Sequence, residues 1–228
     1  MYGLSLLRLF TSEQPIWGIS ELADQLELSR PTAHRYAATC LELGYLEQPP
    51  LRRYRLPRRA AQPGIALLGS LALAREATPI LRELRRQSGR TVSLALLEHT
   101  DILYVVRLRG FLRGQYQLER GLGAGSRRPA RESAAGKALN AAVTDRDDHL
   151  GHIHESELPV DEGVPSSGAR GLAIAVMAEG ERTSAIELTV PAGELSAPEL
   201  IAELGEPLRA AGAEMQARLL EDRASRCA

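Results

Sequence analysis

Polar and cationic side chains gather at the start of a helix predicted between Leu28 and Gly44. They are Ser29, Arg30, Thr32, His34 and Arg35. Groups of these types bind base edges and phosphates when a helix enters the major groove of DNA. The opposite face carries residues that follow helical spacing and can enter a core, namely Ala33, Tyr36, Ala37, Cys40, Leu41 and Leu43. Taken alone, the segment is equally compatible with a capped amphipathic helix of any function.

The ends of this helix and the segment before it favour a helix-turn-helix. Ser29 is a good N-cap, Pro31 fits the first turn, and Gly44 suits the position just after a helix. Ahead of it, Ser20 is expected to cap a shorter helix in SELADQLEL, without a capping box because residue 23 is alanine. Two helices joined by so short a turn form the pattern in which the second helix reads the major groove.

An arginine-rich hairpin is predicted directly after Gly44. The segment YLEQPPLRRYRL reads as two short strands with Pro49 and Pro50 at the turn. The residues expected to contact DNA from this hairpin are Arg52, Arg53, Tyr54 and Arg55. The guanidinium groups would meet phosphates or an adjacent minor groove and add affinity with little sequence information. By itself such a hairpin also fits a solvated turn, but its place after a helix-turn-helix favours a DNA contact.

Composition fits a globular protein without an overall attraction to polyanions. The 228 residues are 44% hydrophobic and 25% charged, with a net charge of −1, so any basic surface must be local. Cys40 and Cys227 lie far apart in sequence, which indicates a reducing compartment and no disulfide framework. No apolar run reaches the ~18 residues that a membrane span needs, and no signal peptide opens the chain. We therefore expect a soluble, cytoplasmic protein that does not bind membranes.

The second part of the chain alternates between strand and helix patterns. VSLALLE and ILYVVRL predict a hairpin around His99–Asp101, and LAIAVMA and SAIELTV predict another around Glu179–Gly180. YQLERGLG is expected to form a further strand. Helices at 133–143 and 198–222 then give an α+β domain with an antiparallel sheet. Before them, residues 65–89 are mostly helical with a break expected near Thr78–Pro79.

The chain resembles the IclR-type (isocitrate lyase regulator family) transcriptional regulators. GLSLLRLF, ISELADQLELSRPTAHRYAATCLELGYLE and RYRL resemble the winged helix-turn-helix of that family. TVSLALLEHTDILYVVRL, ESAAGKALNAA and LAIAVMAEGERTSAIELTVPAG continue the resemblance in the same order. It implies a DNA-binding domain at 1–62, a linker helix at 63–77 and a GAF-like effector-binding and oligomerisation domain at 78–228. It also implies a homodimer or homotetramer on a double-stranded DNA operator, without a cofactor.

By the same resemblance, the effector lies between the helix start in PARESAAGKAL and the strand LAIAV. The implied effector-binding residues are Arg131, Ser133, Ala134, Gly136, Leu172, Ala173 and Ile174. A helix N-terminus favours negative charge, and Arg127 and Arg128 lie just upstream, so a small organic acid, aromatic or aliphatic, is the expected effector. The alternative is that these arginines are solvated and SAAG only packs a helix closely on a sheet.

The region between 140 and 163 is shorter than is usual for the family, which bears on the pocket. If that shortening removes the pocket, the second domain would serve dimerisation only. The same stretch contains His149, His152 and His154 among acidic residues. This composition could bind a divalent metal, but polar loops collect such residues by chance, so no metal site is predicted.

An enzymatic function is not predicted from the motifs. The chain has no GxSxG, P-loop, HExxH or paired-cysteine metal motif, and Ser133 and Lys137 have SxxxK rather than SxxK spacing. We therefore predict a regulator, expected to repress a metabolic operon. A small-molecule-binding or enzymatic domain joined to a module that contacts proteins instead of DNA stays open as the alternative.

Overall fold

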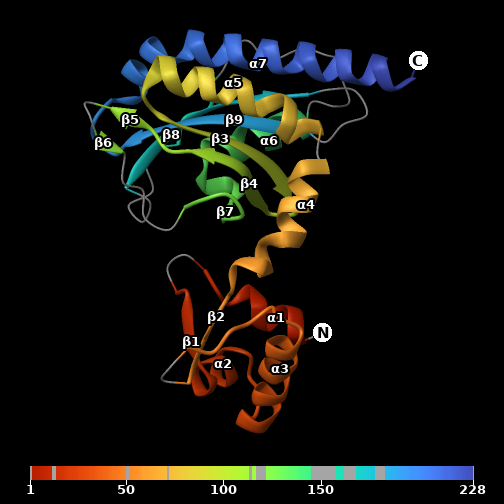
Figure 1. Cartoon of the computed structure of the whole chain (residues 1–228). Coiled ribbons are helices and arrows are strands. Elements are labelled where there is room, and N and C mark those ends of the chain that lie inside the picture. Colours follow the sequence, from red (N-terminus) through yellow and green to blue (C-terminus); the bar gives the residue numbers. More distant parts are fainter. Residues whose placement is uncertain are drawn as a thin grey trace. The chain divides into compact units, whose positions relative to one another are not determined.

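The computed structural model divides into two compact units, Met1–Ser70 and Leu71–Ala228. It describes residues 2–11, 14–49, 52–70, 72–112, 115–116, 122–144, 158–161, 168–177 and 183–227. In that part of the chain, no helix combines the length and the apolar character needed to cross a membrane. Figure 1 colours the elements of both units in chain order.

The first unit is a small helical domain with a short antiparallel ribbon. Its elements are α1 (Tyr2–Arg8), β1 (Ile16–Gly18), α2 (Ile19–Gln25), α3 (Arg30–Glu42), β2 (Arg53–Arg55), η1 (Arg58–Ala61) and α4 (Gln62–Ser70). Its buried core consists of Leu6, Leu22, Ala37, Cys40, Leu46 and Tyr54. The apolar face predicted for α3 thus enters this core through Ala37 and Cys40, which leaves the polar face outside.

The caps of α3 agree with the sequence, and that of α2 does not. Ser29 is the N-cap of α3, with its Oγ accepting from the Thr32 N–H at 3.4 Å. Gly44 takes a φ of +75° just after the helix. Helix α2 instead begins after Gly18, whose N–H donates to the Glu21 carboxylate at 2.7 Å. The prediction of Ser20 as the cap is wrong, because Glu21 satisfies a backbone donor one turn earlier.

The strand that pairs with the arginine-rich strand is not the one predicted. Strand β2 pairs along its length with β1, so that Tyr54 lies opposite Trp17. The first strand expected after Gly44 is reduced to a single bridge between Glu47 and Arg55. The Trp17 indole N–H donates to the Leu9 carbonyl at 3.0 Å and holds this segment against the helical core. Strand β1 is only three residues long, and its pairing with β2 makes it part of the ribbon.

The second unit is an antiparallel sheet between helices, as predicted for an α+β domain. The five strands are ordered β7-β4-β3-β9-β8, with a separate pair β5-β6. Helices α5 and α7 cover one face and α6 the other (Figure 1). The bounds are α5 (Ala72–Ser88), β3 (Thr91–Glu98), β4 (Asp101–Leu108), β5 (Phe111–Leu112), β6 (Gln115–Tyr116), β7 (Arg127–Pro129), η2 (Ala130–Glu132), α6 (Ala134–Thr144), β8 (Ala169–Val176), β9 (Ser184–Pro191) and α7 (Ala197–Cys227).

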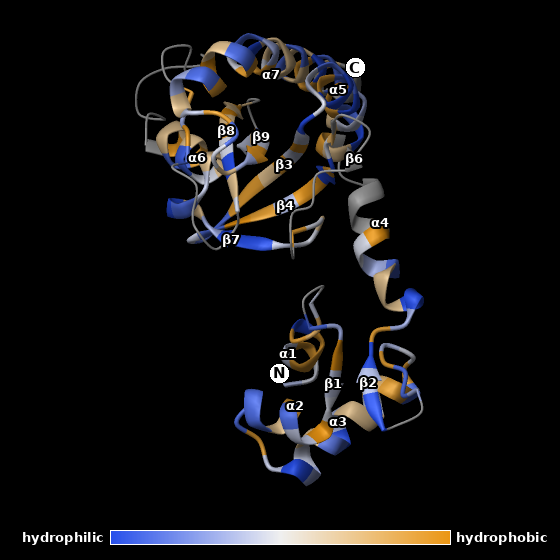
Figure 2. Ribbon diagram, turned by 90° about the vertical axis from the view of Figure 1, so that its left-hand side faces the viewer, coloured by the Kyte–Doolittle hydropathy of each residue, from blue (hydrophilic) through white to orange (hydrophobic). Residues whose placement is uncertain are grey.

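The edge strand beside β4 was not predicted from the sequence. It is β7, a hydrophilic segment (Figure 2), and the short β6 ends at Tyr116, the first residue of YQLERGLG. Residues 117–121 of that segment lie outside the described residues. The two adjacent arginines of β7 do not favour a strand by themselves. The segment is a strand because its backbone pairs with the edge of β4.

Helix α5 runs through the position where a break was expected. It is continuous from Ala72 to Ser88 with Pro79 inside. The Thr78 hydroxyl donates to the Ala74 carbonyl at 2.6 Å, next to the hydrogen bond that proline removes. Three side chains of the following turns are at most 2% exposed, namely Ile80, Leu81 and Leu84. Their burial against the sheet offsets the cost of the proline, so the predicted break is wrong.

Candidate nucleic-acid interface and buried charge cluster

The N-terminal half of α3 presents three cationic or titratable side chains to solvent. Arg30, His34 and Arg35 are exposed, and within the part of the chain that the structure describes no acidic group pairs with them. The Ser29 and Thr32 hydroxyls lie 2.8 Å apart at the helix start. The five residues that the sequence indicated thus lie together at the N-cap and in the first turns of α3, with Arg30, His34 and Arg35 exposed and Thr32 half-buried.

The wing arginines fall into two kinds. Arg52 is exposed at a φ of +53° and has no acidic partner among the described residues. Arg53 is bound to Glu21 at 2.8 Å, and Arg55 is bound to Glu47. The hydrogen bond from the Gly18 N–H, together with Arg53, lowers the pKa of the Glu21 carboxyl. Arg53 thus ties the wing to α2, Arg55 pairs with Glu47 across the hairpin itself, and Arg52 is free to meet a partner.

Tyr54 does not belong to the exposed surface. Its side chain is 2% exposed and is part of the core of the first unit. Strand alternation explains this, because Arg53 and Arg55 on either side point to the opposite face. The tyrosine supports the wing and is not available to DNA.

The residues expected around the effector are only partly brought together. Ser133 and Ala134 are fully buried, and Gly136 is buried with them at the start of α6. Arg131 instead points to solvent with its side chain 83% exposed, next to Glu132 at 3.3 Å. A Cβ on Gly136 would lie 2.1 Å from the Ala130 carbonyl oxygen. Close packing of α6 on its surroundings, the alternative considered above, is therefore one function of this glycine.

Strand alternation separates the three residues expected from β8. Ala173 belongs to the cluster that packs under α6. Ile174 points to the other face, where a Cβ on Gly212 of α7 would lie 3.2 Å from its Cγ2. Leu172 shares the parity of Ile174 and therefore also points toward α7. Only Ala173 of these three shares a face with the start of α6.

A buried carboxylate that the sequence analysis missed lies under the start of α6. Glu187 of β9 is 0% exposed and accepts hydrogen bonds from the Tyr104 hydroxyl at 2.7 Å and the Ala135 N–H at 3.2 Å. Burial raises the pKa of Glu187, and nearby Asp161 raises it further. The hydrogen bond from Tyr104, the charge of Arg107 and the Ala135 N–H act in the opposite direction.

Two arginines converge on this carboxylate from neighbouring strands. The Arg107 guanidinium donates to the Ser93 hydroxyl at 2.7 Å and lies 4.8 Å from the centre of the Tyr104 ring. Arg107 lies opposite Ser93, and Ser93 lies opposite Glu187, so the three form one row across the sheet. Arg128 of β7 is 8% exposed and donates to the Glu132 carbonyl at 2.7 Å.

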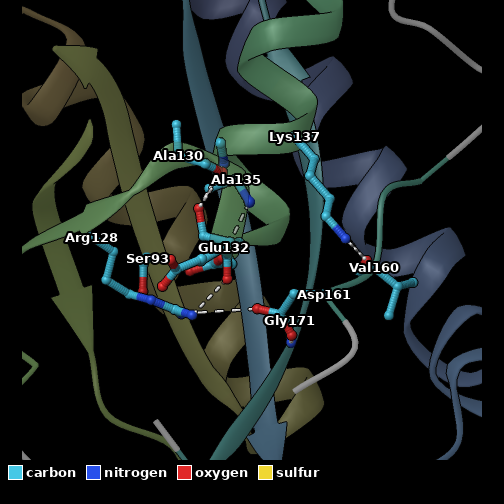
Figure 3. Close-up of polar contacts among 12 residues, drawn as sticks. Ser93, Arg128, Ala130, Glu132, Ala135, Lys137, Val160, Asp161 and Gly171 are labelled. Carbon is cyan, nitrogen blue, oxygen red and sulfur yellow. Dashed lines mark hydrogen bonds and ion pairs between the residues drawn. The ribbon is translucent and has the colours of Figure 1, made fainter. Parts of the chain in front are cut away.

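A second carboxylate completes what we call the buried charge cluster, formed by Tyr104, Arg107, Arg128, Asp161 and Glu187. Asp161 is 2% exposed and accepts from the Gly171 N–H at 2.6 Å (Figure 3). Its other oxygen lies 3.9 Å from Arg128. The sequence signal for this cluster was a charged residue in each of two otherwise apolar strands. Glu187 has the parity of Ala185, which packs under α6, whereas Arg107 reaches this face through the register shift between β3 and β4.

The histidines weighed as metal ligands, His149, His152 and His154, lie outside the described residues. Within the residues that the structure does describe, no group of three or more His, Cys, Asp or Glu side chains is placed to hold a metal ion.

Comparison with known families agrees with both units. Residues 3–50 match the family model of the IclR helix-turn-helix domain, and residues 65–158 match that of the bacterial transcriptional regulator IclR C-terminal domain. The chain belongs to the IclR family of transcriptional regulators, which is not a family of enzymes.

Individual relatives include both a repressor and an activator of transcription. The chain is 30% identical over 148 residues to the transcriptional repressor IclR of Escherichia coli, covering 63% of this chain and 52% of the relative. It is also 30% identical over 148 residues to the p-hydroxybenzoate hydroxylase transcriptional activator of Acinetobacter baylyi, covering 64% and 53%. The chain thus spans about half the length of the curated relatives it matches.

The fold is shared with an IclR homolog from Microbacterium hydrocarbonoxydans that was crystallised in complex with 4-hydroxybenzoate. The TM-score is 0.72 at 21% identity, with 96% of this chain and 98% of the other covered.

Proposed function

We propose that this chain is a DNA-binding transcriptional regulator, whose first unit reads an operator and whose second unit responds to a small organic acid. The observation that carries the DNA-binding proposal is the exposed face of α3. Arg30, His34 and Arg35 have no acidic partner among the described residues, so they can bind DNA without first breaking an ion pair. Their placement after the turn of a helix-turn-helix supports major-groove readout.

The roles within this interface follow from exposure. Base edges and nearby phosphates would be contacted by Arg30, Thr32, His34 and Arg35 on α3. The hydroxyl of Ser29, at the helix start, would donate a hydrogen bond to a phosphate. Arg52 would contact a phosphate from the wing, whereas Arg53 and Arg55 already bind acidic side chains of their own domain. Base contacts specify sequence, and phosphate contacts add affinity.

The effector proposal rests on the chemistry of the second unit and on relatives. The guanidinium groups of buried Arg128 and half-buried Arg107, a tyrosine hydroxyl and a helix N–H converge under α6, and groups of these types bind carboxylates. The Microbacterium homolog in complex with 4-hydroxybenzoate supports an acid, aromatic or aliphatic, as the ligand class.

Assembly and the direction of regulation complete the proposal. A homodimer or homotetramer would place two first units on the half-sites of an operator in the cytoplasm. We propose repression of a metabolic operon that the effector relieves, supported by similarity to the E. coli repressor. By linkage, DNA must change effector affinity by the same factor as the effector changes DNA affinity.

A fluorescence-anisotropy titration of the full chain tests this function. A duplex from the promoter of its own gene should bind more tightly than random duplex, and Arg35→Ala should reduce that preference. An acid that raises the melting temperature should also change operator affinity. Equal affinity for promoter and random duplex, unaffected by Arg35→Ala, would contradict the proposal.

A second candidate keeps DNA binding and assigns the second unit to dimerisation only. It is favoured by the close packing at Gly136 and by the burial of Ser133 and Ala134. A panel of aromatic and aliphatic acids that leaves both the melting temperature and the DNA affinity unchanged would support this candidate.

A further inference from the structure

Glu187 accepts hydrogen bonds from groups that could also bind a carboxylate ligand in the second unit. Its carboxylate already accepts from the Ala135 N–H at the start of α6 and from the Tyr104 hydroxyl. It lies in the same row across the sheet as Arg107. The donors that make this cluster attractive to an organic acid are therefore in use by a carboxylate of the protein itself.

A second carboxylate faces the same point. A Cβ added at Gly171 would lie 3.0 Å from Asp161 Oδ2 and 3.2 Å from Glu187 Oε1. Both carboxylates are buried, and the repulsion between them makes it easier for one of them to take up a proton. The absence of a side chain at Gly171 is what allows the two groups to approach.

The charges of the cluster balance only without an additional anion. The charged or titratable groups that face Glu187 are Tyr104 and Arg107 from β4, Arg128 from β7 and Asp161 from the 158–161 segment. Among the residues that the structure describes, the other elements packed against it contribute the neutral Ser93 of β3, Gly171 and Ala173 of β8, and the Ala135 N–H of α6. Two guanidinium groups oppose two carboxylates, so an added carboxylate would leave one uncompensated buried negative charge.

We propose that Glu187 is a specificity-determining residue that competes with the effector, so that an organic acid enters the cluster together with one proton. The proposal rests on the organic-acid effector described above. A proton from solvent binds a Glu187 carboxylate oxygen and neutralises it. The ligand carboxylate then accepts from the Ala135 N–H and the Tyr104 hydroxyl and lies against the guanidinium groups, so the total charge of the cluster is unchanged.

The position of Glu187 suits this exchange. Its neighbours in register are the small residues Ser93 and Ala173, so a shift of its carboxyl meets little side-chain volume. Burial already raises its pKa, which lowers the cost of taking up the proton. The same coupling predicts that acids bind more tightly as the pH falls and that neutral analogues do not show this dependence.

The first test is rescue of Glu187→Ala by acetate, which needs no knowledge of the natural ligand. Thermal unfolding of the full chain at about pH 7.5 is followed with acetate, with acetamide, and with sodium chloride at equal ionic strength. Acetate is expected to raise the melting temperature of Glu187→Ala, but not that of the wild type. The matched control is Glu98→Ala, which removes a half-buried carboxylate paired with Arg127 outside the cluster and should show no acetate response.

The second test measures 4-hydroxybenzoate affinity by calorimetry between about pH 5.5 and pH 8.5 in buffers of different ionisation enthalpy. For the wild type, Kd should rise about tenfold for each pH unit above the pKa of Glu187, with uptake of about one proton. Glu187→Gln, a neutral isostere, should bind more tightly at the higher pH and with no proton uptake. The neutral 4-hydroxybenzamide should show no pH dependence in either protein.

The outcomes separate the two proposals. The role of Glu187 is overturned if the wild type binds 4-hydroxybenzoate with an affinity that is independent of pH and equal to that of Glu187→Gln. It is also overturned if Glu187→Ala folds but its melting temperature does not change with acetate. If Glu187→Ala does not fold, Glu187→Gln decides the question. If the wild type binds no acid across the pH range but acetate rescues Glu187→Ala, Glu187 blocks the site and the organic-acid effector is wrong.

Discussion

The exposed face of α3 and the buried charge cluster both place arginines near the start of a helix, but they keep them in opposite states. On α3, Arg30 and Arg35 are hydrated and have no acidic partner within the described residues. In the second unit, Arg107 and Arg128 are desolvated beside carboxylates that the chain itself supplies. A charge exposed to water hardly lowers the stability of the folded state and can bind a partner. A buried charge must instead be compensated by an opposite charge within the protein. Substitutions in the two regions should therefore affect different measurements.

The largest effect is expected on stability from Arg128→Ala. The change leaves Asp161 and Glu187 with less compensating charge in a buried place, so unfolding should cost about 3–5 kcal/mol less. That corresponds to a fall in melting temperature on the order of 10 °C. The neighbouring Arg127→Ala is the control, because Arg127 is exposed and its pairs with Glu98 and Asp101 should contribute at most about 1 kcal/mol.

Differential scanning calorimetry of the two variants decides this comparison. Equal losses for Arg128→Ala and Arg127→Ala would contradict the view that the buried cluster is energetically distinct.

The next effect is expected on operator binding from Arg35→Ala. Loss of a base contact should weaken specific binding by about 1–3 kcal/mol, which is roughly 5- to 150-fold in Kd. Binding to random duplex should change much less. Because the side chain is exposed, the free energy of unfolding should stay within about 0.5 kcal/mol of the wild type. A gel shift paired with thermal unfolding checks both statements, and a large loss of stability would place Arg35 in the fold instead.

Substitutions of Ser29 allow an effect on stability to be separated from an effect on DNA binding at one position. Ser29→Ala removes the N-cap of α3 and should lower the unfolding free energy of the first unit by about 1 kcal/mol. Ser29→Asp keeps a capping side chain but places a negative charge beside the proposed phosphate contacts. It should therefore retain stability and weaken DNA binding, as measured by denaturant unfolding and anisotropy. Wild-type DNA affinity in Ser29→Asp would remove this helix start from the interface.

The smallest effect is expected from the wing. Arg52→Ala should weaken binding to all duplexes and reduce the slope of log K against log salt by about one, as one phosphate contact is lost. Arg53→Ala should change the slope less, because Glu21 already holds that guanidinium. Titrations at several salt concentrations give the slopes. A larger slope change for Arg53→Ala would mean that the ion pair with Glu21 opens on DNA.

The polar face of α3 could be predicted because helix periodicity and caps are local properties. Ser29, the helix interior and Gly44 lie within one segment, and each acts on its neighbours in sequence. The same reasoning missed β7, which is a strand only because β4 pairs with it. It also failed at Pro79, where burial of the following turn against the sheet overrides the local preference of proline.

The effector residues predicted from β8 form a consecutive run, and a strand sends alternate side chains to opposite faces. Ala173 lies under α6, whereas Leu172 and Ile174 point toward α7. Alternation alone would have predicted this division. It would not have shown that Glu187, Arg107 and Asp161 meet, because these come from distant segments.

The sequence by itself thus determined the two-part organisation, the α+β class of the second unit, the family and the polar face of α3. These properties follow from periodicity, capping and motif order, which are carried by neighbouring residues. Only the tertiary structure decided which arginines are hydrated and which are neutralised. Burial and charge pairing depend on strand register and on the approach of α6 to the sheet, and no local pattern contains that information.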